Sequence, residues 1–234
     1  MTNPQALKRR LFSKRFINKY IKSLKSNQKL KIVFGGHWSN NPNWLILTKL
    51  EQDITKRLKF SDETVDVIFT EHVIEHLTFL EAINFMIESK RILKKGGIFR
   101  VVCPMIDNLK NIDFRTPNSQ KILNNRILPF FKEENNRLLE LDLNGIFEDP
   151  ELFLFHSFFK KHGHEFIWSA NLMIKVLHKI GFESVKVCEI GKGLDPEACI
   201  ERRRRGIYVG HNWKEELNSE EIFDMQSIVI EAIK

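Results

Sequence analysis

The chain has 234 residues, of which 42% are hydrophobic and 11% aromatic, and this suffices for one domain with a sizeable core. No apolar run approaches the roughly 20 residues that a membrane span needs, and the N-terminus is too basic for a secretory signal. The three cysteines form no C-x-x-C pair, which argues against a cysteine-ligated metal and favours a reducing compartment. We therefore expect a cytoplasmic protein.

Positive charge gathers at the N-terminus. Residues 1–50 hold eleven Lys and Arg and no Asp or Glu, whereas the whole chain carries +7. Residues 5–26 predict an amphipathic helix, and we separate residues 1–28 from a main domain at 29–234. The apolar stripe of this helix consists of Leu7, Leu11, Ile17, Tyr20, Ile21 and Leu24. Two interpretations stay open: the helix contacts a membrane surface or a polyanion, or its stripe packs on the domain.

Strands and helices alternate from residue 30 onward. The pattern predicts strands at 30–36, 43–48, 65–70, 98–104, 184–190 and 206–213. It predicts helices at 79–93, at 170–180 between a Ser169 cap and Gly181, and from Asn218 to Ile233. Residues 105–165 interrupt the alternation and indicate a helical insertion, which is a lid, a satellite core or a dimer surface. Such a chain predicts an α/β fold, a mostly parallel sheet with helices on both faces and ligands at the carboxyl ends of its strands.

Several segments resemble, in chain order, a class I S-adenosylmethionine-dependent methyltransferase. They are "LKIVFGG", "DITKRLKFSDETVDVIFTEHVIEHL", "EAINFMIESKRILKKGGIFRVVCP", "SANLMIKVLHKIGFESVKV" and "RRRRGIYVGHNW". The small members of this type are associated with sugar and cell-surface biosynthesis. The resemblance implies a Rossmann-like sheet of seven strands, the last antiparallel, and S-adenosylmethionine as the cofactor.

The resemblance also implies a set of cofactor-binding residues. A glycine turn after the first strand brings backbone N–H groups close to a ligand, although His37 stands where the family has a second glycine. Thr48 stands where the family has an acid for the ribose, and Glu51 is the available substitute. Asp53 and Ile54 are expected to bind the adenine, and Glu71 is expected to lie near the sulfonium. The full set is Gly35, Gly36, His37, Thr48, Asp53, Ile54 and Glu71.

Residues 72–76 spell H-x-x-E-H, a spacing that zinc peptidases use within a long helix. Here the motif directly follows a predicted buried strand, so we predict no metal. A histidine is the usual base at neutral pH, and His72 at the exit of that strand is our candidate for the catalytic base. A purely structural role at the start of the following helix is the alternative. We expect His76 and His164 to line the acceptor pocket.

The function predicted from the sequence is methyl transfer to a small molecule, by family association a saccharide or a cell-envelope metabolite. One alternative is a methyltransferase-like binding module that has lost catalysis through the changes at His37 and Thr48. Zinc hydrolysis and nucleic-acid methylation are weaker alternatives. No stable nucleic-acid complex is expected, because the Pro-Pro-aromatic motif of base methylases is missing after the fourth family strand. The sequence does not decide the oligomeric state.

Overall fold

The computed structural model describes residues 4–35, 43–110, 113, 115–122, 140, 159, 163–201 and 227–234, with the side chains of the first helix described from Lys14 onward. Several predictions lie outside these residues. They concern Gly36, His37, the strand at 206–213 and most of the insertion at 105–165.

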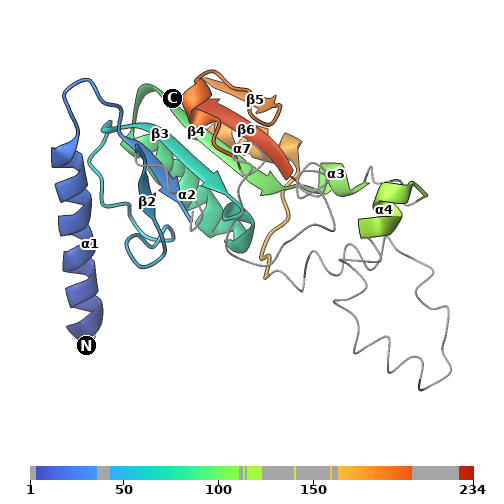
Figure 1. Ribbon diagram of the computed structural model, residues 1–234, viewed down its shortest axis with the longest axis horizontal. Helices are drawn as coiled ribbons and strands as arrows, with labels where there is room; N and C mark the ends of the chain where they lie inside the picture. The colour runs from blue at the N-terminus through green and yellow to red at the C-terminus, as the bar shows by residue number, and fades with distance from the viewer. Residues whose placement is uncertain are drawn as a thin grey trace.

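A six-stranded mixed sheet forms the centre of the described fold (Figure 1). Its strand order is β2-β1-β3-β4-β6-β5, and neighbours pair parallel from β2 through β4 and antiparallel on both sides of β6. The strands are β1 Lys31–Phe34, β2 Leu45–Leu47, β3 Val65–Glu71, β4 Leu93–Pro104, β5 Ser184–Cys188 and β6 Ser227–Ile233. Five of the predicted strands are confirmed, and seven strands are not found among the described residues.

The predicted C-terminal helix is wrong over its second half, which forms β6. Val229 and Ile233 lie four residues apart and so suit a helical stripe, but the segment Ser-Ile-Val-Ile-Glu-Ala-Ile is also rich in β-branched residues. β6 lies between β4 and β5, where both faces of a strand are covered, and Val229, Ile230 and Ala232 are buried. A strand buried on both faces has no alternation to distinguish it from a helix.

Capping residues mark the start of α2 and both ends of α7. The α-helices are α1 Pro4–Ser23, α2 Phe79–Ile92, α3 Ile106–Lys110, α4 Pro117–Ile122 and α7 Ala170–Ile180. Thr78 and Glu81 form a capping box at the start of α2, and the Ser169 hydroxyl accepts from the backbone of Leu172 at the start of α7. Gly181, at a φ of 96°, ends α7 in the left-handed conformation. The predicted cap and end of this helix are confirmed.

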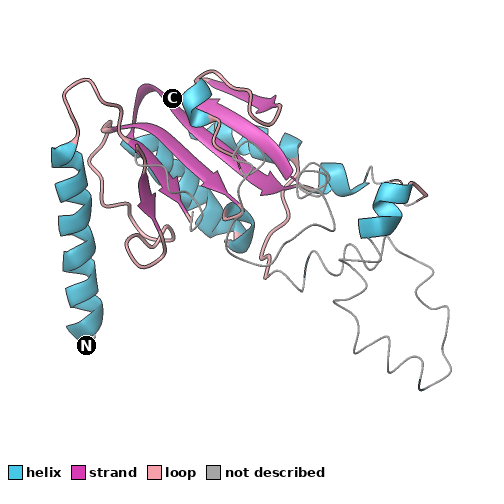
Figure 2. Cartoon of the chain, viewed as in Figure 1, coloured by secondary structure: helices cyan, strands magenta, loops and turns pink. Residues whose placement is uncertain are grey.

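The α-helices that pack on the sheet lie on one face of it within the described residues (Figure 2). Successive side chains of a strand point to opposite faces of the sheet and so belong to two separate cores. In β1, Ile32 and Phe34 face α2 and α7, whereas Val33 faces the other way. That other face is covered by the segment that contains the short 3-10 helix η6, Pro196–Ala198, whose Ala198 is buried there. The prediction of α-helices on both faces is therefore not met within the described chain.

The second half of α1 packs on this domain. Ile17 is fully buried, and Tyr20, Ile21 and Leu24 lie against the same core as α2 and α7. Lys14, Arg15, Lys19 and Lys22 remain exposed on the opposite face. Among the described helices, none combines the length and the apolar character that crossing a bilayer requires.

Candidate functional site at the carboxyl edge of the sheet

The turn after β1 depends on glycine. Gly35 has a φ of 81°, and its backbone N–H donates to the carbonyl of Leu47 at 2.9 Å. A Cβ atom on this residue would lie 2.2 Å from Cγ2 of Val73. Only glycine adopts this backbone conformation without strain and leaves room for Val73. The turn is therefore packed directly against the segment that follows β3.

The carboxylate of Glu51 lies in the turn that follows β2. Oε2 of Glu51 accepts from the backbone N–H of Thr48 at 3.0 Å and from its hydroxyl at 2.5 Å. The Thr48 hydroxyl is thus directed at Glu51, while the second oxygen of the carboxylate remains as an acceptor. The carboxylate of Glu51 therefore has an oxygen that can accept from a ribose hydroxyl, beside the predicted Thr48.

Asp53 is fixed in a tight turn beside this carboxylate. Its Oδ1 accepts from the backbone N–H of Thr55 at 3.0 Å and from the Thr55 hydroxyl at 2.7 Å. Burial alone would raise the pKa of Asp53, but these hydrogen bonds, with the charges of Lys49 and Lys56, hold it below its ordinary value. Asp53 is therefore ionised at neutral pH and retains Oδ2 as an acceptor. Ile54 beside it is half-buried against the main core.

Glu71 and His72 lie at the exit of β3, as predicted. Glu71 is the last residue of the strand and is buried, and the backbone N–H of His72 donates to the carbonyl of Val102 at 2.9 Å. His72 has a φ of 52°, an uncommon conformation for a residue with a side chain. Left-handed backbone at a residue with a side chain stores strain where the chain leaves the sheet.

The imidazole of His72 is held from both sides. Its Nδ1 lies 3.2 Å from Oε1 of Glu75, and its Nε2 lies 3.2 Å from the hydroxyl of Ser227. A carboxylate oxygen only accepts, so Nδ1 is the ring nitrogen that can donate toward Glu75, and Nε2 is the nitrogen directed at the Ser227 hydroxyl. Ser227 is not among the predicted site residues, because it lies in the segment predicted as a helix that forms β6.

The two residues predicted to line the acceptor pocket lie together. The rings of His76 and His164 are 4.9 Å apart between centroids, although 88 positions separate them in the chain. Nδ1 of His76 lies 3.0 Å from the carbonyl oxygen of Gly163. The H-x-x-E-H motif itself is not part of a long helix: Ile74–His76 form a short 3-10 helix, η1, before α2 begins. The two-histidine helical arrangement of zinc peptidases is therefore not formed.

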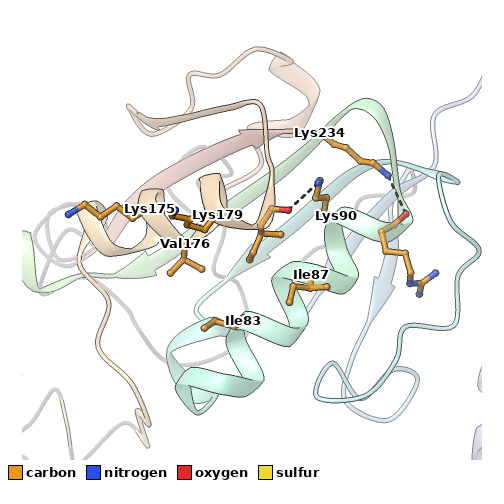
Figure 3. A pocket seen from close by; sticks show the side chains of 9 residues that line it. Ile83, Ile87, Lys90, Lys175, Val176, Lys179 and Lys234 are labelled. Carbon is orange, nitrogen blue, oxygen red and sulfur yellow. Dashed lines mark hydrogen bonds between the residues drawn. The ribbon is translucent and has the colours of Figure 1, made fainter.

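A separate groove of about 630 Å³ lies between α2 and α7 (Figure 3). Ile83 and Ile87 face Val176 across it, and Lys90 donates to the carbonyl of Ile180 at 3.1 Å. None of the predicted site residues lines this groove, so it is not the site at the carboxyl edge. A smaller hollow of about 340 Å³ is lined in part by Ser227, the partner of His72.

Comparison with known proteins agrees with the resemblance seen in the sequence. Residues 22–101 match the model of a methyltransferase domain family. This segment contains β1, β2, β3 and α2 and therefore most of the carboxyl edge. The match supports S-adenosylmethionine-dependent methylation, with S-adenosylmethionine as the cofactor. No curated protein matches the chain.

Solved methyltransferase structures show weak similarity to the chain. An S-adenosylmethionine-dependent methyltransferase from Archaeoglobus fulgidus is 13% identical, with 96% of this chain and 94% of that chain covered and a TM-score of 0.42. One from Thermotoga maritima is 16% identical, with 94% and 97% covered and a TM-score of 0.39. A complex of a Haloferax volcanii methyltransferase with its Trm112 activator gives 12% identity, 94% and 78% coverage and a TM-score of 0.43.

The residues at the carboxyl edge fit this cofactor chemically. S-adenosylmethionine presents amino groups, ribose hydroxyls and a positive sulfonium, and the carboxylates of Glu51, Asp53 and Glu71 are the acceptors and anions that such groups require. The hydroxyl of Thr70, near the end of β3, is also buried and has no hydrogen-bond partner among the described residues. An orphaned buried hydroxyl is costly unless a ligand or water pairs with it.

Proposed function

We propose that the chain transfers a methyl group from S-adenosylmethionine to a small-molecule acceptor at the carboxyl edge of its sheet. One observation carries the proposal: the Gly35 turn packs against Val73, so that the glycine turn and the segment from Glu71 to His76 lie beside one another. This contact falls within the part of the chain that matches the methyltransferase domain. We assign the ribose to Glu51, the adenine to Asp53 and Ile54, and the sulfonium to Glu71.

When bound, S-adenosylmethionine supplies an electrophilic methyl group. The chain binds and orients the acceptor beside it, which supplies much of the acceleration. His72 takes the acceptor's proton at Nε2, once the acceptor hydroxyl replaces that of Ser227 there. The imidazolium that forms then faces the buried carboxylate of Glu75, whose negative charge stabilises it.

For the acceptor, we propose a saccharide or a related cell-envelope metabolite. The sequence resemblance supports this class, and the exposed His76 and half-buried His164 offer polar groups suited to a hydroxylated ligand. Incubating the protein and labelled S-adenosylmethionine with sugars, nucleotide sugars and other small metabolites tests it. Label transfer only to acceptors outside the saccharides and envelope metabolites would contradict this choice and leave methyl transfer standing.

Calorimetric titration with S-adenosylmethionine and S-adenosylhomocysteine tests cofactor binding. We expect both to bind the wild type and to bind Asp53→Asn about ten- to a hundredfold more weakly, since a hydrogen bond to a charged group contributes roughly 1.5–3 kcal/mol. Asp62→Asn is the matched control, because Asp62 pairs with Arg91 on the surface. No binding by the wild type at millimolar ligand would refute the proposal.

Turnover distinguishes the enzyme from an inactive binding module. In His72→Ala we expect cofactor affinity to stay near that of the wild type and kcat to fall by about 10²–10⁴, the usual contribution of a general base. A wild-type protein that binds the cofactor but methylates no acceptor in the panel favours the binding module.

A further inference from the structure

A cluster of ligand-bearing side chains adjoins the proposed methyl-transfer site. Glu75, His76 and His164 each offer one ligand atom, and these atoms all lie within 4.8 Å of one another. Glu75 is buried, His164 is half-buried and His76 is exposed, so the cluster is open to solvent on one side. Two imidazoles and a carboxylate form a donor set that divalent transition metals prefer.

Backbone hydrogen bonds hold the two halves of this cluster together. The N–H groups of Glu165 and Phe166 donate to the carbonyl of Glu75 at 2.9 Å and 3.2 Å. Phe166 also packs against Phe79 and Trp168, with ring centroids 4.8 Å and 4.9 Å away. The position of His164 beside the η1 turn therefore follows from a fixed fold of residues 163–168, and the cluster is preorganised.

Glu75 supplies an independent indication of a ligand. Its side chain is fully buried, yet neither carboxylate oxygen has a hydrogen-bond partner among the described residues. Oε1 lies 3.2 Å from Nδ1 of His72. A buried carboxylate costs several kcal/mol unless it is paired or coordinates a metal. Since Oε1 faces His72, Oε2 is left for a further cation.

The orientation of the His76 ring suits a metal ligand. A carbonyl oxygen only accepts, so the contact with Gly163 places the ring proton of His76 on Nδ1. Nε2 then carries a lone pair on the other side of the ring. Metal-binding histidines are commonly oriented in this way, with the second ring nitrogen donating to a carbonyl or carboxylate.

We propose that Glu75, His76 and His164 bind one divalent transition-metal ion. Ligand atoms about 2.0–2.2 Å from a tetrahedral zinc are roughly 3.3 Å apart, so the cluster closes slightly around the ion. Three protein ligands leave at least one coordination position open. The proposal departs from the sequence analysis, which predicted no metal at this motif.

The ion also suggests how the acceptor is chosen, and this step rests on the proposed function. A divalent cation lowers the pKa of an oxygen that it binds. We therefore infer an acceptor that presents a hydroxyl oxygen to the open position of the ion, beside the base His72. The saccharides proposed above belong to this class.

Titration calorimetry with Zn²⁺ and with Mn²⁺ on tag-free, metal-stripped protein tests the site. We expect the wild type to bind one ion per chain with micromolar or tighter affinity, and His164→Ala to bind at least tenfold more weakly. His178→Ala is the matched control, because His178 is an exposed histidine on α7 outside the cluster. Affinity unchanged in His164→Ala, or no stoichiometric binding by the wild type, would overturn the proposal.

Glu75→Gln is a second variant that removes the charge and keeps the shape. We expect weakened metal binding in this variant, with circular dichroism reporting whether it folds. S-adenosylmethionine binding, measured on the same samples, separates the two proposals. Metal binding without cofactor binding would refute the proposed function alone, and cofactor binding without metal binding would refute this inference alone.

Discussion

Replacing Gly35 by alanine tests whether the turn after β1 requires glycine, both for its backbone conformation and for its close contact with Val73. Two costs add in this variant. Left-handed backbone is unfavourable for alanine by roughly 1–2 kcal/mol, and the new Cβ would lie 2.2 Å from Cγ2 of Val73, an overpacking worth about 1–3 kcal/mol. The expected loss is therefore about 2–5 kcal/mol in the free energy of unfolding, measured by urea denaturation.

Gly96→Ala separates these two costs. Gly96 has a φ of 72°, and a Cβ there would meet no atom within 4 Å, so this variant carries the backbone cost alone, about 1–2 kcal/mol. Adding Val73→Ala to Gly35→Ala removes the clashing methyl group. We expect the double variant to recover about 1–3 kcal/mol relative to the sum of the single losses. Strict additivity, or equal losses at Gly35 and Gly96, would refute the reasoning.

Three further predictions concern stability. Arg100→Met should cost about 3–5 kcal/mol in urea denaturation, because it strands the buried carboxylates of Glu201 and Glu231; a loss below 1 kcal/mol would contradict a paired network. Asp53→Asn should be less stable than the wild type at pH 7, because the lowered pKa of Asp53 in the folded state means that its ionised form stabilises the fold. This difference in unfolding free energy should shrink as the pH falls below about 4. A difference independent of pH would refute the reasoning. Thr78→Ala should lower the free energy of unfolding by about 0.5–2 kcal/mol through the loss of a helix cap, and so lower the thermal midpoint; an unchanged midpoint would argue against the capping box.

The sequence predicted the elements whose pattern and boundaries agree. β3 is a run of apolar and β-branched residues, and α7 has both its serine cap and its terminal glycine in the sequence. β6 was mispredicted as a helix. A strand buried on both faces shows no alternation of apolar and polar residues, and its apolar residues matched a helical spacing by chance. Only its pairing with β4 and β5 distinguishes the two, and that pairing is non-local.

The sequence predicts those residues of the candidate site that lie at the ends of strands. Gly35, Glu51, Asp53 and Glu71 each follow or end a strand, so the parallel topology brings them to one edge. Ser227, one of the partners of His72, could not be predicted in this way. Ser227 reaches it from the other end of the chain through β6, and no local pattern contains that contact.

Burial of charge alone does not distinguish a functional group from a structural one in this protein. Arg100 is fully buried, but its guanidinium donates to Glu201, to Glu231 and to the carbonyl of Lys192, so this buried charge is paired within the fold. Glu75 is equally buried, and its oxygens accept no hydrogen bond from the described residues. Its neighbour His72 departs from the preferred backbone conformation as well. Violations of local rules concentrate where stability is given up for function, which favours the end of β3 over the Arg100 network as the working part of the molecule.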